Sequence, residues 1–563
     1  MRPHIERFEN TNGEKMTELL TAAQMRAIEA AAIASGEVTG LELMERAGRG
    51  VVEAILEEWP ELRATSHRAV VLCGPGNNGG DGFVVARLLK EWGWEVEVFL
   101  YGDPSRLPPD ARVNYERWRG MGEITPASMI PEVRNQDVDI WVDALFGIGL
   151  ARPLDAEAKL LLGATFQKWP VVAIDILSGI DADSGRWIKE PGESDAQRSC
   201  ELTVTFHRAK VGHLIAAGLD SSEKLKVVDI GLPTLNRGRV SVLEYTNEIP
   251  RTLKDVLTTG LNGPGRLRKR EGHKYSHGHA LILSGPSGRG GAARLSARGA
   301  LRIGAGVVTV GCPPDAIPEN AARLDAVMLR GVADAAALAA VLEDGRINAL
   351  CLGPGMGPGA REAGLVGVAL GSQGTPRPTG TGAGGNTDNV GRGVPRLSLV
   401  LDADALTLLS QNPDLFAALH GACILTPHAG EFARLFPDIA AKLAEPATKG
   451  PAYSKVDATR EAAKRAGCVV LYKGPDTVIA DPTGRCAINS AHYDRAAPWL
   501  ATAGSGDVLA GFITGLLARG FSPFDAACTG AWLHVECALS FGPGLIAEDL
   551  PEELPKVFRA LGL

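Results

Sequence analysis

Gly74-Pro-Gly-Asn-Asn-Gly-Gly-Asp-Gly82 stands between an apolar run, Val70-Val71-Leu72-Cys73, and a run that is typical of a helix. A strand, a glycine turn and a helix start place free backbone N–H groups and the positive end of the helix where a phosphate can bind. The spacing is not Gly-x-Gly-x-x-Gly and no Lys-Ser/Thr follows, which excludes a Walker P-loop. A tight turn alone also needs glycine, but Asn77, Asn78 and Asp81 add polar side chains that a turn does not require.

Short runs rich in β-branched residues recur along the N-terminal half. The predicted strands are residues 68–72, 95–100, 138–143, 171–176, 202–206 and 225–230. Stretches long enough for crossover connections separate most of them, which is typical of a parallel sheet with helices on both faces. Thr21-Ala-Ala-Gln24 has the pattern of a capping box before a first helix, and a second helix is predicted near 41–58.

A second series of strands follows a connector rich in Pro, Gly and Arg. These strands are predicted at 279–283, 306–310, 349–352, 397–401, 423–426, 469–473 and 477–480. We therefore expect two α/β domains, a Rossmann-like three-layer sandwich over 19–245 and a second three-layer sandwich over 271–563. An N-terminal extension (1–18) and a linker (246–270) complete the chain. Residues 371–396 contain eight Gly and three Pro, which is typical of an insertion in a surface loop.

The composition excludes several classes of protein. A chain of 563 residues is too long for one hydrophobic core, and its net charge of −8 argues against a basic nucleic-acid-binding surface. No apolar stretch approaches the ~20 residues of a membrane span. The nine cysteines are scattered and form no Cys-x-x-Cys pair, which favours reduced thiols in the cytoplasm over disulfides or a structural zinc site. We expect a cytoplasmic protein with neither nucleic-acid nor membrane partners.

Polar side chains mark the ends of two further strands in the N-terminal half. Asp143 ends one strand, and Asp175 with Ser178 ends the next, both beside glycines. Ligands of open parallel sheets bind at this edge, although either Asp alone is equally typical of a helix cap. Oxygens from Asn78, Asp143 and Ser178 are suited to a hard monovalent or divalent cation.

Four segments together resemble the YjeF N-terminal family, the NAD(P)HX epimerases. They are MERAG (44–48), GPGNNGGDG (74–82), VDALFGIG (142–149) and DILSGIDADSG (175–185). The resemblance implies that K⁺ is bound by Asn78, Asp143 and Ser178. It also implies that the hydrated nicotinamide nucleotide contacts Asn77, Asn78, Gly79, Gly80, Asp81, Gly147, Ile148, Gly149, Leu150, Ala151, Arg152, Pro153 and Asp175.

The C-terminal half carries a glycine turn of its own, ATAGSGDVLAG (501–511), which leads into a long apolar helix. Amides at such a helix start stabilise negative charge on a transferring phosphoryl group. Asp507 lies in the first turn, where a carboxylate accepts the proton of an attacking hydroxyl, although an acidic residue there is also ordinary helix chemistry. His428 and Glu431 follow the end of another strand. Glu431 is a candidate to orient Mg²⁺-bound water, or is an ordinary carboxylate at a helix start. His428 offers a hydrogen-bonding imidazole, or is an ordinary core histidine.

Seven ordered segments of this half resemble the YjeF C-terminal family, the ADP- or ATP-dependent NAD(P)HX dehydratases of the ribokinase-like fold. Among them are VLDADAL (400–406), LTPHAGEFARL (425–435), LYKGPDTVI (471–479) and ATAGSGDVLAG (501–511). The resemblance implies a ribokinase-like sandwich in which the hydrated nucleotide faces Ala293, Gly355, Gly357, His428 and Asp507. It implies that the adenine nucleotide contacts Lys473, Gly474, Pro475, Asp476, Thr477, Gly504, Ser505 and Gly506.

The two resemblances imply one function, the repair of hydrated NADH and NADPH. The N-terminal half would interconvert the R and S hydrates with K⁺. The C-terminal half would dehydrate the S hydrate with ADP and Mg²⁺, with Asp507 as the general base. We expect a homo-oligomer. The alternatives are a ribokinase-class small-molecule kinase with a regulatory N-terminal nucleotide-binding domain, and an N-terminal half that only binds nucleotides or partners.

Overall fold

The computed structural model describes most of the chain and divides it into two compact units. The described residues are 18–126, 129–130, 137–165, 169–194, 198–232, 256–258, 266–269, 271–371 and 396–563. The first unit comprises 18–256 together with 444–455, and the second comprises 257–443 together with 456–563. The predicted extension apart from Glu18, most of the predicted linker and residues 372–395 of the predicted insertion lie outside the described residues.

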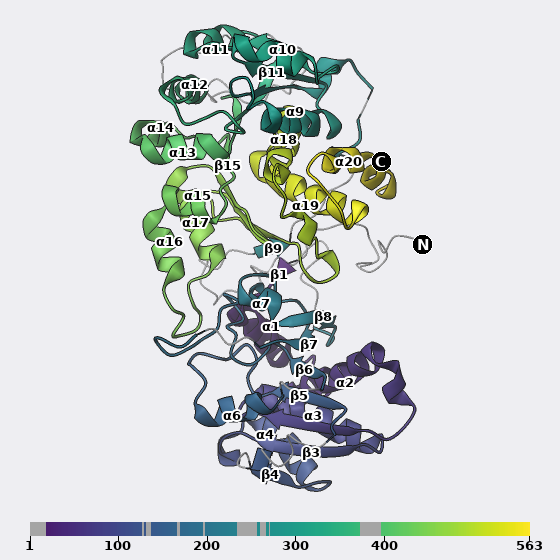
Figure 1. Cartoon of the computed structure of the whole chain (residues 1–563). Coiled ribbons are helices and arrows are strands. Elements are labelled where there is room, and N and C mark those ends of the chain that lie inside the picture. Colours follow the sequence, from purple (N-terminus) through teal and green to yellow (C-terminus); the bar gives the residue numbers. More distant parts are fainter. Residues whose placement is uncertain are drawn as a thin grey trace. The chain divides into compact units, whose positions relative to one another are not determined.

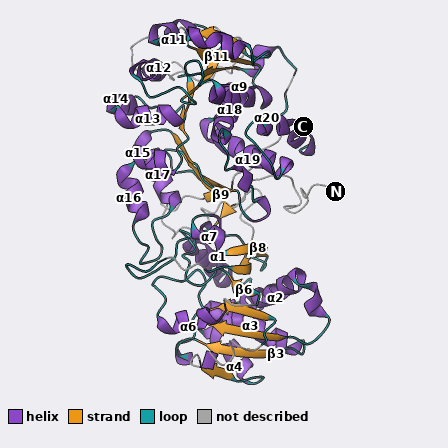
Figure 2. Ribbon diagram, viewed as in Figure 1, coloured by secondary structure: helices purple, strands orange, loops and turns teal. Residues whose placement is uncertain are grey.

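The first unit is built on a parallel sheet of seven strands in the order β4-β3-β2-β5-β6-β7-β8 (Figures 1 and 2). Its strands are β2 (Arg68–Cys73), β3 (Glu95–Leu100), β4 (Ile124–Pro126), β5 (Ile140–Ala144), β6 (Val171–Ile174), β7 (Cys200–Phe206) and β8 (Ser222–Val228), and the two-residue β1 (Glu18–Leu19) precedes them. Its helices are α1 (Ala22–Ala34), α2 (Gly40–Glu58), α3 (Asn77–Glu91), α4 (Pro109–Arg119), α6 (Ala156–Thr165) and α7 (Ala217–Asp220).

Both faces of this sheet are buried. Ala69, Val71 and Cys73 of β2 belong to the core formed with α1–α4, whereas Val70 and Leu72 face a second core that includes α6. This alternation along one strand is the period of two that places successive side chains on opposite faces. The first two helices begin at complete capping boxes, as the sequence predicts for the first of them.

The second unit contains a longer, mixed sheet. Nine of its strands follow one another in the order β18-β17-β16-β15-β14-β13-β10-β11-β12, parallel except for the antiparallel pairs β16–β17 and β17–β18. They are β10 (His279–Leu283), β11 (Val307–Cys312), β12 (Met328–Gly331), β13 (Ile347–Leu352), β14 (Ser398–Leu401), β15 (Cys423–Leu425), β16 (Val469–Tyr472), β17 (Asp476–Ala480) and β18 (Cys486–Ser490). The short β9 (Val256–Thr258) lies at the boundary of the units.

Helices cover this sheet on both sides. On one side are α9 (Gly291–Arg302), α18 (Ser505–Ala518), α19 (Pro523–Phe541) and α20 (Asp549–Ala560), which share one apolar core with the strands (Figure 1). The others are α10 (Ile317–Ala321), α11 (Ala335–Leu342), α12 (Ala360–Leu370), α13 (Ala403–Gln411), α14 (Pro413–Ala417), α15 (Ala429–Leu435), α16 (Pro437–Ala444) and α17 (Lys455–Ala466). Of these, α13, α15 and α17 lie on the opposite side of the sheet from α18 and α19 (Figure 1).

The predicted fold class, two α/β domains with mainly parallel sheets between helices, is confirmed. Each predicted strand is present, although the bounds shift by a few residues. The prediction misses β1, β4, β9, β12 and β18, of which β4 and β12 are edge strands of three and four residues. Within the described residues, every helix is too short or too polar to cross a membrane. All nine cysteines lie in the described part, are buried and form no disulfide.

Neighbouring turns at the carboxyl ends of the strands approach each other very closely. A Cβ atom on Gly74, which follows β2, would lie 1.7 Å from the backbone oxygen of Leu145, which follows the adjacent β5. A Cβ atom on Gly353, which follows β13, would lie 1.7 Å from the backbone oxygen of Asp402, which follows β14. Because both obstacles are backbone atoms in a packed region, only glycine fits at these positions without moving a turn.

We predict that Gly74→Ala destabilises the first unit by about 1–3 kcal/mol, because the added methyl group overpacks a rigid contact. Thermal unfolding of the full chain measures the effect. Gly76→Ala is the matched control, since a Cβ atom there would have no neighbour within 4 Å. Equal melting temperatures for the two variants would contradict the prediction.

Candidate functional site

The glycine-rich segment of the first unit is mostly helix rather than turn. The helix α3 begins at Asn77, with Gly76 at its N-cap, so that residues 77–82 form its first turns. The sequence predicts a later start, because glycine is a poor helix former. Packing decides otherwise: a Cβ atom on Gly79 would lie 2.0 Å from the backbone oxygen of Gly74, and one on Gly82 would lie 2.7 Å from Cβ of Ala144. The amides at the start of α3 are thus held directly at the ends of β2 and β5.

Residues 145–148, which follow β5, contact four of the predicted site residues of this unit. The amide of Leu145 donates to Asp143 (3.2 Å), that of Phe146 to Oγ of Ser178 (2.9 Å) and that of Ile148 to Oδ2 of Asp175 (3.2 Å). A Cβ atom on Gly147 would lie 3.0 Å from both Oδ1 of Asn78 and Oδ2 of Asp175. The structure therefore brings Asn78, Asp143, Asp175 and Ser178 around one turn, as the sequence predicts.

Asp143 and Ser178 form a fully buried pair. Oδ1 of Asp143 accepts from Oγ of Ser178 (2.7 Å), and Oδ2 accepts from the amide of Ser178 (2.9 Å). Burial raises the pKa of Asp143 above its ordinary value, although the hydrogen bonds from Ser178 and Leu145 oppose the shift. Nearby, Nδ2 of Asn78 is buried with no hydrogen-bond partner. A buried amide without a partner, close to a buried carboxylate, indicates a ligand-binding site.

Asp175 is held by a buried lysine that the sequence analysis missed. Nζ of Lys210 lies 3.0 Å from Oδ1 of Asp175 and also donates to Oγ1 of Thr205 (2.7 Å), which donates to Asp175 (2.9 Å). Burial alone raises the pKa of Asp175, but the charge of Lys210 outweighs it and the pKa is below its ordinary value. The backbone of Asp175 has φ of 68°, a left-handed conformation that is strained for this residue. A lysine just beyond the end of the strand 202–206 was the available signal.

A buried imidazole fixes the backbone of the same strand end. His213 accepts at Nδ1 from the amide of Lys210 (3.0 Å), so Nε2 carries the proton and donates to the backbone oxygen of Asp175 (2.8 Å). Burial, with the charge of Lys210, lowers the pKa of His213 to about 4. His213 is therefore neutral at physiological pH and acts as a fixed hydrogen-bonding group.

Two further acids near Asp175 have raised pKa values. Burial, with the charge of Asp175, raises the pKa of Glu29 to about 7. Burial, with the charges of Asp175 and Glu29, raises the pKa of Asp81 well above its ordinary value. Groups whose pKa values are pushed apart within one site are candidates for paired acid and base roles. The sequence analysis predicted Asp81 as a site residue and missed Glu29.

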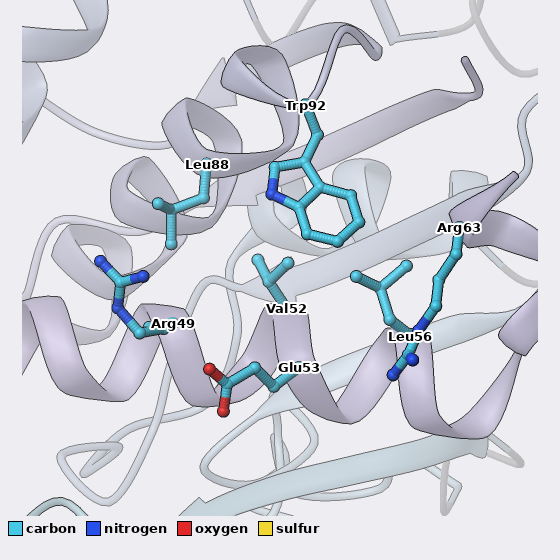
Figure 3. Close-up of a pocket in the computed structure, with 7 residues that line it drawn as sticks. All are labelled: Arg49, Val52, Glu53, Leu56, Arg63, Leu88 and Trp92. Atoms are coloured by element: carbon cyan, nitrogen blue, oxygen red, sulfur yellow. The ribbon is translucent and has the colours of Figure 1, made fainter. Parts of the chain in front are cut away.

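A separate surface pocket of about 320 Å³ lies between α2 and α3. Apolar groups and ions of both signs line it, namely Arg49, Val52, Glu53, Leu56, Arg63, Leu88 and Trp92 (Figure 3). No predicted site residue is among them. We place the candidate site at the carboxyl edge of the sheet, where the buried charges and the orphaned amide are.

In the second unit the predicted site lies where α18 begins. Gly504, with φ of 87°, is the N-cap, and Asp507 is in the first turn. Burial, with the charges of Asp402, Asp404 and Glu431, raises the pKa of Asp507 to about 7, while Lys473 opposes the shift. A carboxyl group with this pKa exchanges its proton readily at neutral pH, which suits a general base.

Asp402, which the sequence analysis also missed as a site residue, links the predicted elements of this site. Its Oδ1 accepts from Nζ of Lys473 (2.8 Å) and from Oγ1 of Thr426 (2.8 Å). The Nζ atom of Lys473 also lies 3.8 Å from Oε2 of Glu431. Asp402 directly follows β14 within the segment 400–406, so a strand-end aspartate was the signal, as it was for Asp143.

The remaining predicted residues of this unit take different positions. His428 is exposed and caps α15, where its Nδ1 accepts from the amides of Gly430 (3.0 Å) and Glu431 (3.3 Å). It is thus a cap rather than a core histidine, and its Nε2 faces Glu431 at 3.5 Å. Ala293, on α9, is fully buried, whereas Gly355 has φ of 65° and lies against the backbone of Arg289.

The segment 473–477 forms a tight turn between β16 and β17. Oγ1 of Thr477 donates to the backbone oxygen of Gly474 (2.8 Å) and accepts from its amide (3.2 Å). Gly506 lies near this turn, because a Cβ atom on it would be 3.5 Å from Nζ of Lys473. The structure therefore brings together Lys473, Gly506 and Asp507, as the sequence predicts.

Comparison with known proteins gives matches over both halves. The family model described as YjeF-related protein N-terminus matches residues 40–212, and the model described as NAD(P)H-hydrate dehydratase matches 280–556. A bifunctional NAD(P)H-hydrate repair enzyme of Moorella thermoacetica is 33% identical over 574 residues, which cover 96% of this chain and 97% of that protein. An NAD(P)H-hydrate epimerase of Rhodobacter capsulatus is 51% identical over 205 residues, 35% of this chain and 92% of that protein. A solved ADP/ATP-dependent NAD(P)H-hydrate dehydratase from Bacillus subtilis is 25% identical, with a TM-score of 0.39, over 52% of this chain and 93% of that chain.

We predict that Lys210→Met destabilises the first unit by about 3–5 kcal/mol, because it leaves the buried Asp175 charge without its partner. Adding Asp175→Asn should restore most of the loss, and thermal unfolding measures both. Lys224→Met is the control, because Lys224 also pairs with a carboxylate, that of Glu58, but on the surface. If Lys210→Met lost no more stability than Lys224→Met, the buried pair of Lys210 and Asp175 would not stabilise the unit.

Proposed function

We propose that this chain restores NADH and NADPH whose nicotinamide ring has taken up water, because it belongs to the family of bifunctional NAD(P)H-hydrate repair enzymes. The first unit interconverts the R and S epimers of the hydrate. The second unit dehydrates the S epimer at the expense of ADP, giving AMP and phosphate. A relative that matches almost the whole chain supports the presence of both activities in one protein.

The position of Asp507 carries the proposal for the second unit. A carboxyl group with a pKa of about 7 lies in the first turn of α18, beside the amides that follow Gly504. Asp507 takes the proton of the hydrate hydroxyl, whose oxygen bonds to the β-phosphorus of ADP while the bond to the bridging oxygen breaks and AMP leaves. The new phosphate then leaves with the C–O electron pair as a proton leaves the neighbouring carbon, which restores the ring double bond. Phosphorylation thus replaces hydroxide by a better leaving group.

The hydrate and the adenine nucleotide bind on opposite sides of the start of α18. The hydrate contacts Ala293, Gly355, Gly357 and His428, and the adenine nucleotide contacts residues 473–477 and 504–506. Within the described residues there is no preformed cluster of three or more metal-binding side chains. This fits Mg²⁺ that arrives with ADP, since Mg²⁺ is commonly held by substrate phosphates, water and one or two carboxylates. Glu431 and Asp402 are the carboxylates that would hold it, and bound Mg²⁺ would neutralise charge on the phosphates.

The epimerase site is proposed at the carboxyl edge of β2, β5 and β6. Residues 77–81 and 147–153 hold the hydrate, with the start of α3 facing its phosphates. Asp175, whose pKa is lowered, is the base that accepts a proton. Asp81 and Glu29, whose pKa values are raised, are the acids. This division gives one group that accepts a proton and others that donate one at neutral pH.

The same edge fits K⁺. Asn78, Asp143 and Ser178 offer oxygen atoms, and the orphaned amide of Asn78 is free to turn its own oxygen toward a cation. Bound K⁺ would supply positive charge beside the buried carboxylate of Asp143. Ser178 and the amides of residues 145 and 146 would hold the ligands in place.

We predict that Asp507→Asn lowers the rate of ADP-dependent dehydration of the S epimer by about 10²–10⁴-fold. Since the ionised form is the base and the pKa is about 7, kcat/KM of the unaltered chain should fall as the pH drops below about 7 and level off above it. Recovery of NADH absorbance measures both. Asp414→Asn is the control, because Asp414 is an exposed acid in the first turn of α14. Dehydration at the control rate, or a stable phosphate ester as product, would overturn the assignment.

We also predict that Asn78→Ala separates the two activities. With a mixture of epimers, ADP, Mg²⁺ and K⁺, the unaltered chain should convert the whole mixture to NADH at one rate. The variant should convert the S fraction at the normal rate and the R fraction only as fast as it epimerises spontaneously. Replacing K⁺ by Li⁺ should have the same effect on the unaltered chain. Rapid full conversion by the variant would exclude Asn78 from the epimerase site.

Two further expectations stay predictions, the homo-oligomeric state and the cytoplasmic location. Light scattering of the purified chain measures the first. Fractionation of the cells that produce it measures the second.

A further inference from the structure

Residues 444–455, here called the strap, run from the last residue of α16 to the first residue of α17 but belong to the first compact unit. Two backbone–backbone hydrogen bonds and one hydrogen bond to a side chain attach the strap there. The amide of Lys189 donates to the oxygen of Ala447 (2.9 Å), and the amide of Gly450 donates to the oxygen of Ala151 (3.3 Å). The amide of Ala452 donates to Oδ2 of Asp181 (3.0 Å). The strap is therefore bonded along its length to the N-terminal half of the chain.

Side chains strengthen this attachment. Arg186 donates through Nη1 to the backbone oxygen of Tyr453 (3.0 Å) and through Nη2 to that of Glu445. Ala447 is 4% exposed and belongs to the core that also contains Leu150 and Leu177. Burial in a shared core, with hydrogen bonds at both ends, indicates a built contact.

The contact is closest at the segment 147–153. A Cβ atom on Gly450 would lie 2.7 Å from the backbone oxygen of Leu150, 3.1 Å from Oδ1 of Asp181 and 3.6 Å from Cα of Ala151. Within the segment, the amide of Leu150 donates to the oxygen of Gly147 (3.3 Å). At its start it is held by Asp175, through the amide of Ile148. The strap thus packs against the middle of the segment 147–153, at Leu150 and Ala151.

Asp181 connects the strap to the end of β6. Its Oδ2 accepts from the amide of Ala452 and from both the amide (3.1 Å) and the hydroxyl (2.5 Å) of Ser184. Asp181 lies six residues beyond Asp175 and is 5% exposed. A carboxylate with this number of donors is rigid, so the strap contacts a fixed point and positions the segment 147–153 against it.

We infer that the strap is a positioning element of the epimerase site, supplied by the C-terminal half of the sequence, which fixes residues 147–153 in the conformation that binds the hydrated nucleotide. The inference rests on the proposed function, in which this segment contacts the hydrate. Gly450 and Arg186 are positioning residues and touch no reacting atom. Loosening the strap raises the entropy that the segment loses on binding, so it weakens binding more than it slows the chemical step.

Gly450→Val in the full-length chain tests this inference. The added side chain meets the backbone of Leu150, so the strap must move away. We expect KM for the R epimer in the epimerase reaction to rise about tenfold with kcat within about twofold. The kinetics of ADP-dependent dehydration of the S epimer should be unchanged. Gly421→Val is the matched control, because a Cβ atom there has no neighbour within 4 Å.

Arg186 provides an independent variant from the other side of the contact. Arg186→Ala should raise the same KM, and Arg186→Lys, which keeps one donor and the charge, should restore part of it. Amide hydrogen exchange of residues 148–152, measured without nucleotide, should be faster in Gly450→Val and Arg186→Ala than in the unaltered chain.

The outcomes separate the inference from the proposed function. An unaltered chain without epimerase activity would refute the proposed function, and unchanged exchange in the variants would refute the strap's effect on the segment. An active chain whose variants keep both the KM and the exchange of the unaltered chain would overturn the inference. A parallel loss of kcat in both reactions would show general unfolding and would also overturn it.

Discussion

The close approach of neighbouring turns at the carboxyl ends of parallel strands is the constraint on which both units depend. In the first unit the turn after β2 meets the backbone after β5 at Gly74, and in the second the turn after β13 meets the backbone after β14 at Gly353. A side chain at either position would separate the two turns. Because the strands are adjacent and parallel, polar groups that follow them are then forced into one small volume.

Crowding of this kind produces the same electrostatic arrangement twice. In each unit a strand-end aspartate pairs with a buried or half-buried lysine, Asp175 with Lys210 at 3.0 Å and Asp402 with Lys473 at 2.8 Å. One lysine cannot neutralise every carboxylate nearby. A further acid is left with a raised pKa, about 7 for Asp507 in the second unit, and such acids are the groups that transfer protons at neutral pH.

The chain order and the spatial order differ at one important place. Residues 444–455 lie between two helices of the second unit in the sequence, yet they complete a core and support a loop of the first. The strap is irregular, and its hydrogen bonds are made with backbone groups, Asp181 and Arg186 rather than within a sheet. Separate halves of this chain would therefore not be equivalent to the two compact units.

The sequence by itself determined the two α/β domains, most of the strands and the grouping of Asn78, Asp143, Asp175 and Ser178. Period-two apolar runs and glycine turns are local signals, and parallel strands bring their ends together by geometry alone. Only the tertiary structure decided that α3 begins at Asn77, because packing against Gly74 and Ala144 overrides the low helix propensity of glycine. It alone also showed that Lys210 pairs with Asp175 and Asp402 with Lys473, that the pKa of Glu29 is raised and that the strap belongs to the first unit, since no local pattern records which distant residues meet.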